Sequence, residues 1–276
     1  MNSILKLPSP TWFVGCGNMG GAMLEGWRGA GVDVTGGVAI RPSGRDVEGV
    51  RTVKSPVDAG PPPKLAILGF KPQDLDEVAP GLARRLSAKT VIISLLAGVE
   101  AATLRGRFPG AGMIVRAVPN LPVSIRRGVV ALYSEDASEE GKDQLSPLFA
   151  VLGFALWVPS EDRLAAIGSI AGAGPAYVAR FIDALAKAGT DRGLDESNAR
   201  TIALETVLGT SWMAAATNES MADVARRVAS PKGTTEAGLA VLDSDGVLDG
   251  LIAVAIEAAA RRGTEMAAEA RGEKVD

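Results

Sequence analysis

Over its first 160 residues the chain alternates between short apolar segments of strand length and segments with helical spacing, and only helical patterns follow. Strands that are apolar throughout are buried on both faces, which is typical of parallel sheets covered by helices. A helix between consecutive strands is the connection that parallel neighbours require. These patterns predict an α/β fold, with a doubly wound parallel sheet in residues 1–160 and an all-helical domain in residues 161–276.

The expected strands are residues 11–15, 37–41, 64–70, 91–96, 113–118, 129–133 and 154–158, and the expected helices of the first domain are 20–30, 74–86 and 138–152. The expected helices of the second domain are 164–170, 175–192, 196–216, 221–228, 235–242 and 247–270. In the last helix, residues 248–260 are apolar around most of the circumference, which requires burial on nearly all sides. A small helical domain encloses few such helices by itself, so we predict a homodimer formed through the helical domains.

Composition excludes several classes of function. The net charge is −3 and no block of Lys or Arg stands out, so we expect no nucleic-acid partner. The chain has no histidine and one cysteine, Cys16, which excludes Ser-His and Cys-His catalysis, imidazole-zinc sites and thiolate clusters, and we predict no metal. Residues 1–10 lack the apolar core of a signal peptide, and the longest apolar run, 91–99, is about half a bilayer span. We therefore expect a soluble, cytoplasmic protein without a membrane partner.

The sequence Gly-Cys-Gly-Asn-Met-Gly at residues 15–20 fits G-x-G-x-x-G and lies between the first expected strand and the first expected helix. Glycines allow the tight turn and the close approach of a pyrophosphate, which then lies at the positive N-terminus of the helix. A glycine-rich turn without a ligand is the alternative. The position favours a Rossmann-type dinucleotide site, whose cofactor-binding residues are Gly15, Gly17, Asn18, Met19 and Gly20.

The residues after the second expected strand indicate which dinucleotide is bound. An NAD site places Asp or Glu there to hold the ribose hydroxyls, whereas this chain has no carboxylate between Ile40 and Asp46. Arg41, Ser43 and Arg45 occupy the stretch and suit a 2′-phosphate through charge-assisted hydrogen bonds. A solvated basic turn is the alternative. The pattern favours NADP, bound as NADPH.

Six segments in the same order resemble the pyrroline-5-carboxylate reductases. They are Phe-Val-Gly-Cys-Gly-Asn-Met-Gly at 13–20, Phe-Lys-Pro-Gln at 70–73, Ile-Ser-Leu-Leu-Ala-Gly at 93–98, Val-Arg-Ala-Val-Pro-Asn at 115–120, Ala-Gly-Ala-Gly-Pro-Ala-Tyr at 171–177 and Ser-Pro-Lys-Gly-Thr-Thr at 230–235. The resemblance implies a Rossmann domain followed by a helical dimerisation domain. It also implies NADPH-dependent reduction of 1-pyrroline-5-carboxylate to L-proline, by a homodimer or a larger ring of dimers.

The resemblance also implies roles for individual residues. Lys71 and Pro72 would lie close to the cofactor, and Ala97, Gly98 and Asn120 would lie near the nicotinamide, with Asn120 also a catalytic candidate. These positions follow expected strands, and ligands of open α/β sheets collect at the carboxyl ends of strands. Without the resemblance, Lys71 reads as an exposed loop lysine.

The loop 230–235 is the expected substrate site. The resemblance assigns the substrate carboxylate to Ser230, Gly233, Thr234 and Thr235, and places Thr235 near the ring nitrogen as a catalytic residue. Free N–H groups at a helix N-terminus suit a small carboxylate. An ordinary capped helix start, in which the hydroxyls serve only as caps, explains the same residues.

Three departures from the family pattern leave the substrate open. Ala171 and Ala173 stand where the family has serines, and Lys232 replaces a glycine inside the substrate loop. A related imine reductase is one alternative. A reductase of the 3-hydroxyacid dehydrogenase type is another, although it would need a helical-domain lysine and Lys187 has the spacing of a surface pair with Asp183. A non-catalytic NADPH-binding regulator is the third.

Overall fold

The computed structural model describes residues 4–273, which form two compact units. The sheet unit comprises the chain as far as Ala173 together with the residues from Ala259 onward, and the helical unit comprises Gly174–Ala258. The last helix, α10 (Val247–Ala270), therefore begins in the helical unit and ends in the sheet unit. The sequence-based boundary at residue 160 lies thirteen positions before the end of the first segment of the sheet unit, Ala173.

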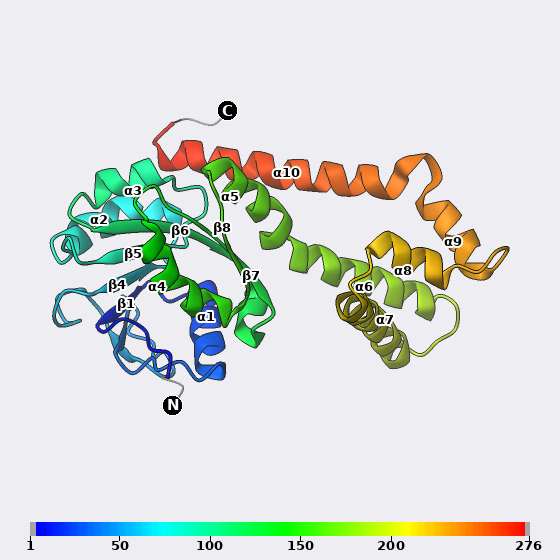
Figure 1. The fold of residues 1–276 in the computed structure, drawn as a ribbon, viewed down its shortest axis with the longest axis horizontal. Coiled ribbons are helices and arrows are strands. Elements are labelled where there is room, and N and C mark those ends of the chain that lie inside the picture. The colour runs from blue at the N-terminus through cyan, green and yellow to red at the C-terminus, as the bar shows by residue number, and fades with distance from the viewer. Residues whose placement is uncertain (1–3, 274–276) are drawn as a thin grey trace. The chain divides into compact units, whose positions relative to one another are not determined.

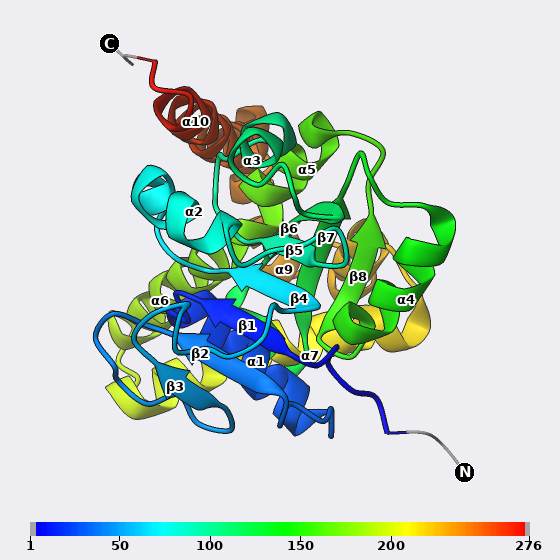
Figure 2. The ribbon, with the colours of Figure 1, turned by 90° about the vertical axis from the view of Figure 1, so that its left-hand side faces the viewer.

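The sheet unit is built on one eight-stranded sheet with the strand order β3-β2-β1-β4-β5-β6-β7-β8 (Figures 1 and 2). The strands are β1 (Thr11–Val14), β2 (Gly37–Ile40), β3 (Arg51–Val53), β4 (Leu65–Leu68), β5 (Val91–Ser94), β6 (Met113–Pro119), β7 (Gly128–Tyr133) and β8 (Gly153–Trp157). Every neighbouring pair is parallel except β6 and β7. The sheet is thus mostly parallel, and the carboxyl ends of β1, β2, β4, β5 and β6 share one edge.

Helices cover both faces of the sheet. One face packs against α1 (Asn18–Gly29) and α4 (Glu139–Ala150), and the other packs against α2 (Leu75–Ala83) and α3 (Ala101–Arg107) (Figure 2). All residues of β1, β2 and β4 are buried, because alternate side chains point into the two helical layers. The end of α10 lies on the second face, where Ala270 packs against the apolar cluster.

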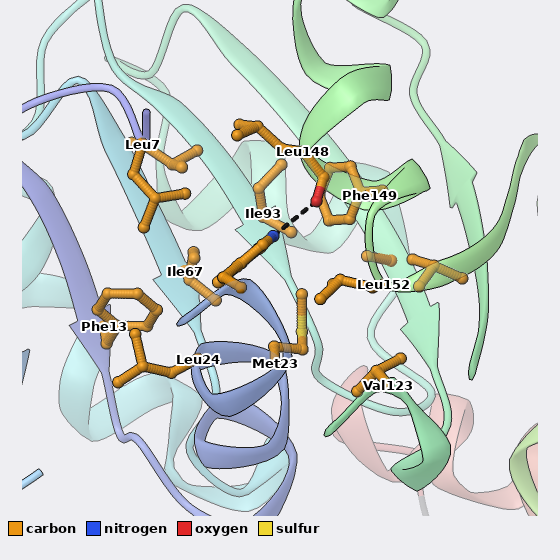
Figure 3. Packing of buried hydrophobic residues seen from close by; sticks show 14 of the residues in the cluster. Leu7, Phe13, Met23, Leu24, Ile67, Ile93, Val123, Leu148, Phe149 and Leu152 are labelled. Atoms are coloured by element: carbon orange, nitrogen blue, oxygen red, sulfur yellow. Dashed lines mark hydrogen bonds between the residues drawn. The ribbon is translucent and has the colours of Figure 1, made fainter. Parts of the chain in front are cut away.

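The first apolar cluster centres on α1. Trp27 donates its indole N–H to the carbonyl of Leu148 over 2.6 Å, the hydrogen bond drawn in Figure 3, and its ring centroid lies 6.2 Å from that of Phe13. A Cβ at Gly26 would lie 2.2 Å from the carbonyl oxygen of Val123, so only glycine allows α1 to approach the 3₁₀ turn η2 (Leu121–Ile125). This packing fixes the helix whose N-terminus follows the glycine motif.

The predicted α/β fold is confirmed, with three corrections. β3 was not predicted, because three residues that include Arg and Thr carry too little apolar pattern. The seven-residue helix α3 was also missed. The third correction concerns β7, which runs antiparallel to β6 and makes the sheet mixed. The other predicted strands and helices occur, with ends shifted by a few residues.

A continuous helical stretch begins in the sheet unit and enters the helical unit. It starts with α5 (Glu161–Ile167) and the π-helical turn η3 (Gly168–Gly172), and continues as α6 (Gly174–Thr190). By length and composition alone, the helical stretch 161–190 is a candidate membrane span, because an 18-residue window within it has a mean hydropathy of 1.2. Scattered polar residues divide this stretch, so it contains no long uninterrupted apolar run and was not predicted from the sequence as a candidate span.

The helical unit consists of α6, α7 (Glu196–Thr217), α8 (Met221–Val228), α9 (Thr234–Leu242) and the first half of α10. The side chain of Asp195 caps α7 by accepting from the N–H of Asn198. Many large apolar side chains of this unit are exposed within one chain. They include Val178, Phe181, Ile202, Leu208, Leu251 and Val254.

Candidate active site

The glycine loop joins β1 to α1. Gly15 has φ +74°, and a Cβ there would lie 2.6 Å from the Cβ of Phe70, so no other residue fits. A Cβ at Gly17 would meet only the carbonyl oxygen of Gly69, at 3.8 Å, so the chain leaves space beside the loop. Gly17 is the N-cap of α1, whose start has no side-chain cap and no acidic residue in its first turn. The helix N-terminus therefore presents unsatisfied N–H groups with a positive dipole, which fits a bound pyrophosphate.

The side chain of Cys16 points into the core rather than toward the solvent. It is 5% exposed, and burial raises the pKa of its thiol, while the positive charge of Arg41 opposes that shift. A thiol with a raised pKa is a poor nucleophile, because the thiolate is the reactive form.

Arg41, Ser43 and Arg45 form the turn that follows β2. The N–H of Arg41 donates to the carbonyl of Val53 in β3 over 2.8 Å, so the strand that the sequence analysis missed is the one that holds this residue. The hydroxyl of Ser43 accepts from the N–H of Arg45 at 3.3 Å. Within residues 4–273, neither arginine forms an ion pair. Two uncompensated cations beside a phosphate-binding loop favour an anion such as a 2′-phosphate.

The other predicted cofactor residues follow strands that end at the same edge of the sheet. Lys71 and Pro72 come after β4, with Lys71 exposed and Pro72 at the first position of the 3₁₀ turn η1 (Pro72–Asp74). Ala97 and Gly98 come after β5, where Ala97 is exposed and Gly98 has φ +76°. Because neighbouring parallel strands carry these loops, the sheet brings them beside the glycine loop.

Asn120 follows β6 and is buried, with 7% of its surface exposed. Its side-chain oxygen accepts from the N–H of Val129 at 2.8 Å, and its side-chain nitrogen donates to the carbonyl of Ala171 at 3.0 Å. The amide therefore ties the end of β6 to β7 and to η3, a structural role that the sequence analysis did not anticipate. The second N–H of the Asn120 side-chain amide has no partner in these two hydrogen bonds, so this geometry allows it to donate to a bound ligand.

The predicted substrate loop lies in the helical unit, at the start of α9. Gly233 is the N-cap of α9, and no side chain caps this helix. The N–H of Lys232 donates to a carboxylate oxygen of Glu236 over 2.6 Å, and Lys232 has φ +60°, a conformation that suits the glycine it replaces. Within the described residues 4–273, the hydroxyls of Ser230 and Thr235 make no hydrogen bond, and Thr235 is half-buried. These hydroxyls are free for a ligand rather than used as caps.

The two alanines that replace serines flank Gly172 at the end of η3. Ala171 and Ala173 are both half-buried, and the carbonyl of Ala171 is the acceptor for Asn120. The carbonyl of Ala171 is therefore hydrogen-bonded within the protein even though residues 171 and 173 carry no hydroxyl. In the part of the chain that the structure describes, no group of three or more His, Cys, Asp or Glu residues could hold a metal ion.

Comparisons with known proteins match both parts of the chain. Residues 161–266 match the family model described as pyrroline-5-carboxylate reductase dimerisation, and residues 12–98 match the one described as NADP oxidoreductase, coenzyme F420-dependent. The pyrroline-5-carboxylate reductase of Pseudomonas aeruginosa is 32% identical over 92% of this chain and 96% of its own length. The chain belongs to the pyrroline-5-carboxylate reductase family. The resemblance seen in the sequence is thereby confirmed.

Other members of the pyrroline-5-carboxylate reductase family agree over nearly the whole length. Pyrroline-5-carboxylate reductase 2 of Bacillus subtilis is 31% identical over 92% of this chain and 94% of its own. The Coxiella burnetii reductase structure is 30% identical, with a TM-score of 0.84 over 98% of this chain and 100% of that one. A Plasmodium falciparum reductase solved with NADP bound has the same TM-score of 0.84 at 23% identity, which shows the shared fold.

Membership of the family gives the exposed apolar side chains of the helical unit a partner, because the matched segment is the family's dimerisation domain. The first thirty matched residues are the helical stretch 161–190 described above, so this stretch is part of the matched dimerisation segment. The chain forms homo-oligomers through this domain.

Light scattering at micromolar concentration is expected to give at least twice the chain mass of 28.4 kDa. Leu251→Glu should shift the population toward monomer, because this side chain is 65% exposed on α10 and a carboxylate in an apolar interface is strongly unfavourable. Val57→Glu is the matched control, since Val57 is 75% exposed on the sheet unit. A wild-type monomer, or equal masses for both variants, would contradict this interface.

Proposed function

We propose that this protein reduces the cyclic imine 1-pyrroline-5-carboxylate to L-proline with NADPH, the last step of proline biosynthesis. The observation that carries the proposal is the likeness to pyrroline-5-carboxylate reductases along nearly the whole chain, with both loops of the predicted site present. We also propose a cytoplasmic enzyme, divided functionally at residue 160, whose dimers associate into a larger ring.

The residues of the sheet unit fit the cofactor. The N–H groups of residues 17–20 would hold the pyrophosphate, and Arg41, Ser43 and Arg45 would hold the 2′-phosphate. Lys71 and Pro72 would border the cofactor, and Ala97, Gly98 and Asn120 would border the nicotinamide. When bound, NADPH supplies the hydride that adds to the C=N carbon.

The residues of the helical unit would act on the substrate. The start of α9, with Ser230, Gly233 and Thr234, would bind the substrate carboxylate through N–H and hydroxyl donors. The free hydroxyl of Thr235 would donate a hydrogen bond to the ring nitrogen as that nitrogen gains its proton. The chain contains no histidine to serve as the acid, so positioning by these donors would supply much of the rate.

The deciding experiment follows NADPH oxidation with 1-pyrroline-5-carboxylate beside a panel of other cyclic imines and 3-oxo acids. We expect turnover with 1-pyrroline-5-carboxylate, formation of L-proline and the highest kcat/KM for that substrate. A higher kcat/KM for another imine or for a 3-oxo acid would show that the protein is a related reductase with a different substrate. NADPH binding without turnover of any compound would make the protein a regulator.

Ala173→Ser tests whether the missing serines alter the substrate. The site is half-buried and a serine adds one hydroxyl, so we expect the free energy of unfolding to change by less than about 0.5 kcal/mol. Activity with 1-pyrroline-5-carboxylate should be kept or improved, as measured by kcat/KM beside a thermal melt. Complete loss of activity in a folded variant would show that the site around residue 173 is shaped for another substrate.

A further inference from the structure

The loop after β5 carries Ala97 and Gly98, the residues proposed to border the nicotinamide, and it ends at the start of α3. Gly98 has φ +76°, and the side chains on either side of this pair, Leu96 and Val99, are buried. Glu100 is the N-cap of α3, yet its side chain does not cap the helix. The backbone at the beginning of α3 therefore depends on another part of the chain for its cap.

That cap comes from Glu161, sixty residues later in the sequence. The N–H of Ala101 donates to a carboxylate oxygen of Glu161 over 2.9 Å, and the same oxygen accepts from a guanidinium nitrogen of Arg116 over 2.5 Å. The side chains of Arg116 and Glu161 are only 12% and 28% exposed. Because Arg116 lies beside Ser94 in the sheet, the pair connects the end of β5, the loop and the first residue of α5.

The opposite side of the loop is held by the last turns of α10. A Cβ at Gly98 would lie 2.9 Å from both the backbone nitrogen of Ala267 and the carbonyl carbon of Met266, so the loop and the backbone of this helix are in close contact. Arg271 pairs with the carboxylate of Glu100 over 2.7 Å, which explains why Glu100 does not cap its own helix. The loop is thus held between Glu161 and the end of α10.

We propose that Glu161 and Arg271 are positioning residues that hold the loop 97–101 in the conformation that receives the nicotinamide. Neither residue touches the proposed cofactor site directly; each acts through the loop, Glu161 at Ala101 and Arg271 at Glu100. Both residues belong to the sheet unit, Glu161 at the start of α5 and Arg271 just after the end of α10. The inference rests on the proposed function only in assigning Ala97 and Gly98 to the nicotinamide.

The test compares two ligands that differ only in the presence of the nicotinamide ring. Calorimetry measures the Kd of NADPH and of 2′-phospho-ADP-ribose, which lacks the nicotinamide, for wild type and Glu161→Gln. The glutamine keeps an acceptor for Ala101 and loses the charge that binds Arg116. We expect the Kd of NADPH to rise roughly three- to tenfold while that of the fragment stays unchanged, and kcat to fall about tenfold or more.

Glu139→Gln is the matched control. Glu139 is also the first residue of a helix that follows a serine N-cap, but its partner is Lys142 on the surface and its side chain is 86% exposed. Both Kd values should stay at the wild-type level in this variant. If Glu161→Gln does not fold, Arg271→Gln decides by the same comparison, because the ion pairs of Arg271 with Glu100 and Glu273 are partly exposed and their loss should cost little stability.

Unchanged NADPH affinity in a folded Glu161→Gln, or equal weakening of both ligands, would overturn the positioning role. If the wild-type protein binds NADPH no more tightly than the fragment, the nicotinamide makes no favourable contact with this loop. That result would overturn the positioning role as well. A protein that passes the two-ligand test but does not reduce 1-pyrroline-5-carboxylate would refute the proposed function and leave the positioning role standing.

Discussion

Thr235→Val is expected to lower the turnover of 1-pyrroline-5-carboxylate by roughly ten- to a thousandfold, the effect of one positioned catalytic hydrogen bond. Valine keeps the shape of threonine and removes only the hydroxyl, which within residues 4–273 has no hydrogen-bond partner in the protein. Steady-state kinetics should show the loss in kcat. The Kd of NADPH should stay constant, because the residues proposed to hold the cofactor phosphates belong to the sheet unit.

Two variants sharpen this result. Ser230→Ala should raise KM with little change in kcat, since its proposed role is carboxylate binding. Thr217→Val is the matched control, because that hydroxyl at the end of α7 lies within hydrogen-bonding distance of groups of its own chain, the carbonyl of Met213 at 2.9 Å and a carboxylate oxygen of Glu219 at 3.1 Å. Normal turnover by Thr235→Val would mean that water or another group supplies the proton, even if the reaction itself is correct.

Arg41→Ala should weaken NADPH binding by about 1.5–3 kcal/mol, or roughly ten- to 150-fold, which is the range for a hydrogen bond to a charged group. The affinity for NADH should change little, because NADH lacks the 2′-phosphate. Titration of both cofactors against wild type and variant measures the difference. The effect should shrink at high salt, since Arg41 is only half-buried and its charge is screened.

Arg84→Ala is the control, because it also removes one positive charge from the surface. Arg84 is exposed at the end of α2 and is not among the residues proposed to bind the cofactor. Its affinity for NADPH should equal that of the wild type. Equal affinity of wild type for NADH and NADPH would end the assignment of Arg41, Ser43 and Arg45 to the 2′-phosphate.

The sequence determined the features that depend on neighbouring residues. The alternation of apolar strands with helices predicted the α/β sheet, because burial on both faces leaves a local composition pattern. The glycine motif was recognisable because Gly15 needs a positive φ and close approach to Phe70, demands that only glycine meets. The helix at residues 248–260, which is apolar around most of its circumference, likewise predicted a partner subunit, and the family match supports that prediction.

Only the tertiary structure decided which distant groups support these local motifs. β3 holds Arg41 through a single backbone hydrogen bond, and Asn120 bonds to the backbone of Val129 and Ala171, 9 and 51 positions away. Glu161 reaches Ala101 across 60 positions. A residue that binds a remote backbone group needs no particular neighbours in its own segment, so its role leaves no periodic pattern. Such contacts arise only when folding brings the segments together.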